Sequence, residues 1–199
     1  MLNEKENNYL ASIYLDETGI GFSYCDVSTG EWYVTEITPE ESKETLYNEL
    51  ARIGIREIIL QPDFRDFWEL EDLKSSTGAY LTQLTSSYYQ KDGIVRTIFD
   101  HFEAQSLTGL GLGELGCGLF AAGALLKYLF ETQKQSLSHL KRIQVYQRGS
   151  VMALDKATLR NLEITETLFD KKVQGSLLGV LDKTHTAMGS RKMKKWLRE

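Results

Sequence analysis

Apolar and polar residues alternate along the start of the chain with the two-residue period of a β-strand. Residues 8–17 and 19–27 both follow this pattern, and the Thr18-Gly19 pair between them suits a tight turn. A third alternating stretch covers residues 31–37. The pattern predicts three consecutive antiparallel strands. The apolar faces of the first two are Tyr9, Ala11, Ile13 and Leu15, and Ile20, Phe22 and Tyr24.

The pattern then changes to a helical period over residues 38–54. Thr38 and Glu41 have the spacing of a capping box, which predicts that the helix begins there. Residues 55–60 contain few polar side chains, as expected for a strand buried deep in a sheet and reached by a crossover. The predicted order is therefore βββαβ. The stripe expected to face the core is Leu46, Leu50 and Ile53.

The remaining chain divides into a mixed part and a purely helical part. Residues 63–73, 92–102 and 114–133 are predicted helices, the last apolar nearly all round and so expected inside the core. Residues 79–85 suit an edge strand, and 140–150 a strand or an extended link. We predict a mixed α/β fold with three divisions. These are a sheet domain over 1–136, a link over 137–150, and a helical unit over 151–199 with helices at 155–168, 175–182 and 188–199.

The last predicted helix carries an apolar stripe with no following sequence to cover it. Met193, Trp196 and Leu197 recur at the spacing of one helix face. Uncovered apolar surface favours fraying, contact with a neighbouring copy, or folding back on the sheet domain. Of these we expect self-association through Trp196. We also expect residues 1 to about 148 to be stable without the helical unit.

Composition adds little to this picture except by exclusion. Among the 199 residues, 42% are hydrophobic and 26% charged, the range of ordinary globular proteins. The longest apolar run, residues 118–130, is interrupted by Lys127 and is too short to cross a bilayer. Cys25 and Cys117 are far apart, which favours two reduced, buried thiols and a cytoplasmic location.

The charges are unevenly distributed along the chain, whose net charge is −5. Residues 1–60 carry four basic and twelve acidic residues, so this part opposes binding to a nucleic acid backbone. Residues 183–199 carry six basic residues and one acidic residue. This segment suits an acidic partner or phosphate, although a solvated helix face is the simpler interpretation. The candidate contacts are Lys192, Lys194 and Lys195.

One sequence resembles a dinucleotide-binding motif. Gly111, Gly113 and Gly116 match G-x-G-x-x-G, and Glu131 follows at the distance of a ribose-binding acid. Such a site needs a strand before the glycines and another that carries the acid. Here a predicted helix precedes the glycines, and Glu131 belongs to the same helix that follows them. The nucleotide interpretation is therefore rejected.

The βββαβ order also begins ribonuclease-H-like nucleases, which hold two metal ions with clustered carboxylates. Asp16 and Asp26 are the acids available at strand ends. Both precede turns, where aspartate commonly caps the backbone, and turn capping is the favoured interpretation. His101, His139 and His185 have no ligand spacing, and the sequence contains no P-loop. We therefore predict no catalytic, cofactor or metal residue in this chain.

The C-terminal segment resembles the start of the core, or lever, domain of the bacterial MutS mismatch-repair family, in which T-x-R-N-L-E precedes L-x-x-x-L-D-x-T-x-T-x-M-G-x-R and a Trp-Leu pair. Residues 7–32 are similar to the opening of that family's connector domain, and 111–140 to its closing helix. The matching positions are Thr158, Arg160, Asn161, Leu162, Glu163, Leu177, Leu181, Asp182, Thr184, Thr186, Met188, Gly189, Arg191, Trp196 and Leu197.

The resemblance implies a ribonuclease-H-like connector followed by the first helices of an incomplete lever domain. It implies a non-catalytic role in transmitting conformational change between the ATPase and mismatch-binding ends, and a docking surface for MutL. ATP, magnesium, mismatched DNA and a second MutS subunit would belong to the intact parent, through domains absent here. Two alternatives remain: a metal-dependent nuclease of the ribonuclease-H-like class, and a small DNA-binding protein using its basic C-terminal helix.

Overall fold

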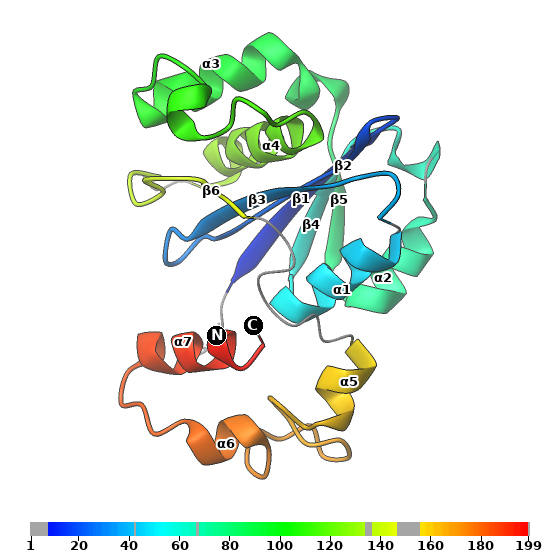
Figure 1. The fold of residues 1–199 in the computed structure, drawn as a ribbon, viewed down its shortest axis with the longest axis vertical. Coiled ribbons are helices and arrows are strands. Elements are labelled where there is room, and N and C mark those ends of the chain that lie inside the picture. Colours follow the sequence, from blue (N-terminus) through cyan, green and yellow to red (C-terminus); the bar gives the residue numbers. More distant parts are fainter. Residues whose placement is uncertain (1–7, 42, 67, 134–136, 147–155, 199) are drawn as a thin grey trace.

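The structure is a computed structural model that describes residues 8–41, 43–66, 68–133, 137–146 and 156–198. A mixed sheet lies between two layers of helices, and three further helices form an arc beside one end of the sheet (Figure 1). The strands are β1 (Tyr9–Asp16), β2 (Gly19–Asp26), β3 (Trp32–Ile37), β4 (Glu57–Leu60), β5 (Tyr80–Gln83) and β6 (Gln144–Val145). The helices are α1 (Lys43–Ile53), α2 (Leu70–Thr77), α3 (Lys91–Phe102), α4 (Cys117–Thr132), α5 (Lys156–Asn161), α6 (Leu177–Leu181) and α7 (Ala187–Trp196).

The strand order across the sheet is β5-β4-β1-β2-β3-β6. Strands β1, β2 and β3 are antiparallel neighbours, as the alternation predicts. Strand β4 pairs in parallel with β1, and β5 in parallel with β4 at the edge. The predicted buried strand and edge strand are both confirmed. The segment 140–150 contributes the short strand β6, which pairs in parallel with β3 at the opposite edge.

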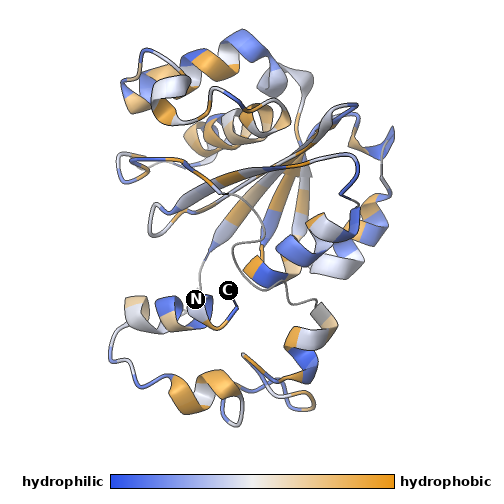
Figure 2. Cartoon of the chain, viewed as in Figure 1, coloured by the Kyte–Doolittle hydropathy of each residue, from blue (hydrophilic) through white to orange (hydrophobic). Residues whose placement is uncertain are grey.

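Each face of the sheet buries its own apolar cluster. One face packs against α1 and α2, with Phe22 and Leu46 both fully buried. The other face packs against α3 and α4, with Ile94 and Leu125 fully buried. Helix α4 is apolar nearly all round and lies inside this second layer, as predicted (Figure 2). All seven predicted apolar residues of β1 and β2, and the predicted stripe of α1, belong to the first cluster.

Helices α1 and α2 begin several residues later than predicted. Thr38 donates from its backbone N–H and its hydroxyl to Oε2 of Glu41, both at 3.3 Å, and the backbone N–H of Glu41 donates back to the carbonyl of Thr38 at 3.0 Å. The bond from the Thr38 N–H to Glu41 is one half of the predicted capping box, but it forms in a turn at residues 38–41, before α1 begins at Lys43. Within the predicted helix 63–73, a 3-10 turn at Phe64–Asp66 comes first, and α2 follows.

The C-terminal helices are shorter than their sequence pattern predicts. Helix α5 ends at Asn161 because the backbone turns through Glu163, which has a positive φ of 48°. Few side chains in this arc are buried, chiefly Ile164 and Leu178. The predicted boundary between residues 150 and 151 lies outside the described residues. No helix in the described ranges is long and apolar enough to span a membrane.

Candidate functional site

The T-x-R-N-L-E motif, residues 158–163, forms the C-terminal end of α5 and the turn after it. The backbone carbonyl of Thr158 accepts from the N–H of Leu162 at 2.9 Å, within the last turn of the helix. The carboxylate of Glu163 accepts from the N–H of Leu168 at 2.6 Å, and its backbone carbonyl accepts from Leu177 at 3.1 Å. Glu163 thus connects the end of α5 to the start of α6. This part of the motif has a structural role.

The second motif organises the entry to α7 around Asp182. The carboxylate Oδ1 of Asp182 accepts from the backbone N–H of Thr184 at 3.0 Å and from its hydroxyl at 2.6 Å, while Ser190 donates to Oδ2. Thr186 caps the helix by accepting from the N–H of Gly189 at 3.0 Å. A Cβ at Gly189 would lie 3.0 Å from Cβ of Thr184, so the spacing favours glycine.

The remaining candidate residues do not converge on one site. Leu197 is half-buried, and Lys192 lies with Nζ 5.5 Å from the ring centre of Trp196, whose side chain is 61% exposed. The structure therefore gathers no catalytic cluster from the motif residues that it describes. The exposed members are Arg160, Asn161, Leu162, Leu177, Leu181, Thr186, Met188, Lys192 and Trp196.

Instead, the basic face of α7 lies against the end of the sheet, and Arg191 makes the first contact. Nη1 of Arg191 donates to the hydroxyl of Ser28 at 2.7 Å and lies 4.0 Å from Oδ2 of Asp26. The side chain of Asp26 is 1% exposed, so its charge is almost fully removed from water. A buried carboxylate of this kind needs a nearby cation. Arg191 supplies that cation from a position 165 residues later in the chain.

Lys195 makes the second contact, one helical turn further along α7. Its Nζ donates to the hydroxyl of Tyr33 at 2.7 Å and to Oε2 of Glu31 at 3.1 Å, and lies 4.5 Å from the ring centre of Tyr33. Burial alone would lower the pKa of Lys195, but the hydrogen bonds and charges of Tyr33 and Glu31 outweigh burial and raise it. Lys195 therefore remains charged where it contacts β3.

Arg198 makes the third contact, at the C-terminal end of α1. Its Nη1 donates toward the backbone carbonyls of Arg52 and Ile53, at 3.4 and 3.3 Å. A cation at this position complements the partial negative charge at a helix C-terminus. Arg52 itself is buried and donates to Glu49 at 2.7 Å. Burial would lower the pKa of Arg52, but the hydrogen bond and charge of Glu49 raise it.

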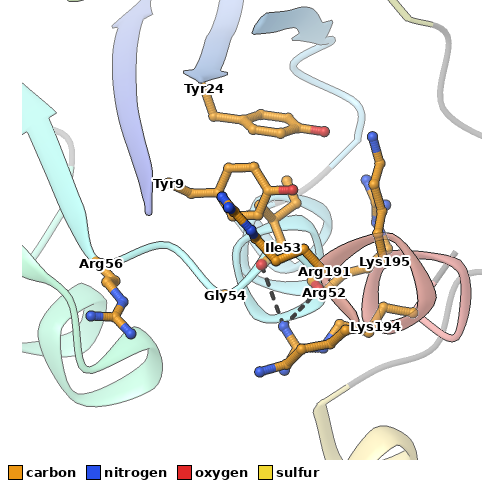
Figure 3. Close-up of a pocket in the computed structure, with 10 residues that line it drawn as sticks. Tyr9, Tyr24, Arg52, Ile53, Gly54, Arg56, Arg191, Lys194 and Lys195 are labelled. Carbon is orange, nitrogen blue, oxygen red and sulfur yellow. Dashed lines mark hydrogen bonds between the residues drawn. The ribbon is translucent and has the colours of Figure 1, made fainter. Parts of the chain in front are cut away.

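A basic cleft lies between α7 and the sheet end, with a volume of about 170 Å³ (Figure 3). Its cationic side chains come from α7 on one side and from α1 and the segment before β4 on the other. Sequence analysis did not predict this cleft; it named folding back on the sheet domain as one of three outcomes for the last helix but favoured self-association through Trp196. The lining residues are Tyr9, Tyr24, Arg52, Ile53, Gly54, Arg56, Arg191, Lys194, Lys195 and Arg198.

The two candidate metal acids serve as turn caps, as the sequence analysis favoured. Oδ1 of Asp16 accepts from the backbone N–H and hydroxyl of Thr18 at 2.7 and 2.6 Å, and Asp26 does the same for Ser28 at 2.8 and 2.5 Å. Asp26 pairs across the sheet with the first residue of β1, whereas Asp16 is its last. The two acids are therefore separated by roughly 24 Å, at about 3.4 Å per strand residue. At this separation Asp16 and Asp26 cannot bind the same pair of metal ions.

The other candidate chemistry is also accounted for by structure. The glycines of the G-x-G-x-x-G sequence follow helix α3 and precede α4, and Glu131 lies on α4 and accepts from Tyr88. Cys25 and Cys117 are both free and buried, as predicted. Burial raises the pKa of Cys117 to about 11, so its thiol is a poor nucleophile at neutral pH. No group of three or more potential metal ligands occurs among the described residues.

Comparisons with known proteins agree with the motifs. The family model for MutS domain II matches residues 8–141, and the model for MutS domain III matches residues 157–199. DNA mismatch repair protein MutS of Lachnoclostridium phytofermentans is 41% identical over 100% of this chain. The proteins of the same name from Alkaliphilus metalliredigens and Halothermothrix orenii are 40% and 39% identical, over 99% and 100% of the chain.

These relatives are much longer than the present chain, which covers 21% to 23% of their length. The family-model matches fall on the two structural parts described above. Domain II corresponds to the sheet with its flanking helices, and domain III to the segment that contains α5, α6 and α7. The chain belongs to the MutS family of DNA mismatch repair proteins and consists of sequence from its domains II and III.

Proposed function

We propose that this chain is a non-catalytic part of a MutS mismatch-repair protein, and that it transmits conformational change between the ATPase and mismatch-binding ends. The observation that carries this proposal is the contact of α7 with the sheet through Arg191, Lys195 and Arg198. It is a mechanical link between the two family domains present in the chain. In the intact protein, movement of the lever domain would be transmitted to the sheet domain through this contact.

The chemistry of the contact suits a link that forms and releases. The described contacts between α7 and the sheet domain are hydrogen bonds and ion pairs, and the large apolar side chain of Trp196 on the same helix is 61% exposed. A polar interface between domains separates at lower cost than a large apolar one, so relative movement is the natural expectation. The contact also defines how α7 lies on the sheet domain, because Arg191, Lys195 and Arg198 have separate partners on the turn after β2, on β3 and at the end of α1.

We also propose the partners and setting that the family suggests. MutL would dock on the connector, a second MutS subunit would complete the assembly, and mismatched DNA would bind through other domains. ATP and magnesium would act in the ATPase domain of the parent, in the cytoplasm. The present sequence has no P-loop, so its residues do not fit that nucleotide site and no step through ATP is assigned to them.

We propose further that the sheet domain is ribonuclease-H-like, with a domain boundary between residues 136 and 151. The support is the antiparallel β1-β2-β3 unit followed by a helix and by strands parallel to β1. The nuclease alternative is weakened because its candidate acids, Asp16 and Asp26, lie at opposite ends of the β1–β2 hairpin. The DNA-binding alternative is weakened because Arg191 and Lys195 contact acidic residues of the same chain.

A charge exchange in a full-length MutS protein that contains this segment tests the proposal. We expect E31K and K195E each to reduce the stimulation of ATP hydrolysis by mismatched DNA severalfold, because allosteric couplings amount to about 1–3 kcal/mol. Hydrolysis without DNA should remain unchanged. The double variant E31K/K195E restores the opposite charges and should recover the stimulation. Normal stimulation in both single variants would contradict a role of this contact in transmission.

A further inference from the structure

The strand that leads out of the sheet domain, β6, has few backbone hydrogen bonds of its own. It contains two residues, lies at one end of the strand order and pairs with β3 (Figure 1). The next residue, Tyr146, donates its backbone N–H to the carbonyl of Val34 at 3.0 Å. A ladder this short at a sheet edge opens locally more easily than the central strands. Side-chain contacts therefore decide how firmly β6 is held on β3.

Tyr146 anchors this segment through its hydroxyl and its ring. The hydroxyl donates to Oε2 of Glu49 on α1 at 2.9 Å. The ring lies edge-on to the ring of Tyr33 on β3, with centres 6.2 Å apart and planes at 84°, and edge-on to the ring of Tyr24 on β2, also at 6.2 Å. Tyr24 is buried and stacks on Tyr33 with ring centres 5.2 Å apart. The three rings form one packed cluster with favourable aromatic geometry.

Tyr33 is also the residue of β3 to which α7 binds. Nζ of Lys195 donates to the Tyr33 hydroxyl at 2.7 Å and lies 4.5 Å from the centre of its ring. A charge-assisted hydrogen bond and a cation–π contact together hold the Tyr33 ring in one arrangement. Because Tyr146 packs edge-on against that ring, the packing of Tyr146 depends on the arrangement that Lys195 favours.

Two further elements are contacted both by α7 and by the link segment, residues 137–146. At the turn after β2, Nε2 of His139 lies 2.9 Å from the carbonyl oxygen of Val27, and Arg191 donates to the hydroxyl of the adjacent Ser28. At α1, Arg198 binds the last carbonyls of the helix that also accepts the hydroxyl of the link segment's tyrosine. The link segment and α7 thus contact the same three parts of the sheet domain.

We infer that α7 and the link segment are held on the sheet domain cooperatively, and that Tyr33 is the residue that couples them. Docking of α7 through Lys195 stabilises β6 on β3, and release of α7 loosens β6. The reverse also holds, because a coupling free energy acts equally in both directions. This inference rests on the same α7 contact as the proposed transmission role and deepens it by naming the strand that responds. The coupling belongs to the 199-residue chain, so it can be present even where α7 has no effect on ATP hydrolysis.

Hydrogen exchange of the Tyr146 amide in the 199-residue chain, followed by NMR, tests the coupling, because this amide reports the pairing of the link segment with β3. Lys195→Ala should accelerate its exchange at least about fivefold, the lower end of ordinary allosteric couplings, and should leave β1 unchanged. Lys192→Ala is the matched control, since the described contact of Lys192 is with Trp196 of its own helix. An unchanged Tyr146 amide in Lys195→Ala, or equal acceleration in Lys192→Ala, would overturn the inference.

The reverse direction is tested from the link segment. Tyr146→Ala should accelerate exchange in α7 by a factor similar to that which Lys195→Ala produces at residue 146. Tyr146→Phe retains the ring contacts with Tyr33 and Tyr24 and loses only the bond to Glu49, so it should accelerate α7 less than Tyr146→Ala. Exchange in α7 that is unchanged in Tyr146→Ala would contradict the coupling.

The role of Tyr33 is tested by a double-mutant cycle. In a Tyr33→Leu background, Lys195→Ala should accelerate the Tyr146 amide by less than about twofold, because the coupling residue is already absent. An acceleration as large as in the parent would show that the coupling does not pass through Tyr33. Circular dichroism establishes that each variant is folded. If Tyr33→Leu does not fold, Tyr33→Phe takes its place: it loses the hydroxyl that binds Lys195 and should at least halve the effect of Lys195→Ala, whereas an undiminished effect would overturn the role of Tyr33.

Discussion

The sheet domain and the C-terminal helices are stabilised by different interactions. In the sheet domain, both faces of a six-stranded sheet bury continuous apolar clusters against helices. Among the described C-terminal residues, Phe169 is 91% exposed and Met188 71% exposed. Turn hydrogen bonds around Glu163 and Asp182, together with cations paired to the sheet, organise that segment instead. The sheet domain is therefore expected to resist salt, whereas the docking of α7 is expected to weaken in salt.

The largest expected effect is on the sheet domain. Phe22→Ala removes a ring that is 0% exposed, and it should lower the free energy of unfolding by roughly 3–5 kcal/mol. Phe169→Ala makes the same chemical change at an exposed position of the C-terminal segment, and its effect should lie within about 0.5 kcal/mol. Urea unfolding of the two variants provides the measurement. Equal losses would mean that Phe169 is buried in solution, and the contrast between the regions would fail.

A smaller and local effect is expected at Asp182, which accepts hydrogen bonds from Thr184 and Ser190 before α7. Asp182→Ala should lower the free energy of local opening of α7 by about 1–2 kcal/mol, since these bonds involve a charged acceptor. Hydrogen exchange should therefore accelerate in α7 and not in β1. Asp170→Ala is the control, because Asp170 is 69% exposed in its ion pair with Lys172. Faster exchange throughout the chain would instead mean that Asp182 stabilises the whole fold and not α7 alone.

The smallest expected effect concerns acid sensitivity at the turn after β1. Burial would raise the pKa of Asp16, but hydrogen bonds from Thr18 and Cys117 outweigh burial and lower it. A carboxylate with a lowered pKa stabilises the fold above its unfolded pKa, and this contribution is lost as the pH falls through the folded pKa. Asp16→Asn should therefore be slightly less stable than the parent at pH 7, and the difference should begin to shrink as the pH falls below about 4, the usual pKa of an aspartate. A difference that stays constant as the pH falls through the pKa of folded Asp16 would exclude charge as its cause.

Much of the sheet domain could be predicted because its signals are local. Alternation places Tyr9 and Phe22 on the same face, and a buried strand such as β4 has few polar residues. The start of α1 was predicted several residues too early, because the hydrogen bonds between Thr38 and Glu41 that a capping box requires form in a turn before Lys43.

The site was missed because its partners are distant in sequence. Lys195 and Glu31 are separated by 164 residues, and no periodicity connects them. One signal was present: residues 1–60 are acidic and residues 183–199 are basic. The acidic excess was taken to oppose, and the basic excess to favour, binding of an external nucleic acid or acidic partner. In the structure, Asp26 and Glu31 instead pair with Arg191 and Lys195 of the same chain. Complementary charge in two segments of one chain is evidence for their contact as well as for external binding.

The most direct test of the account is a charge exchange at Lys195 and Glu31, observed by hydrogen exchange of α7 and β1 in the 199-residue chain. We predict that K195E accelerates exchange in α7, that E31K/K195E restores slow exchange, and that 1 M salt, where the Debye length is only about 3 Å, also accelerates exchange in α7 of the parent. Exchange in β1 should change in none of these cases. If neither the K195E substitution nor salt changes the exchange rate in α7, ion pairs do not hold α7 on the sheet domain.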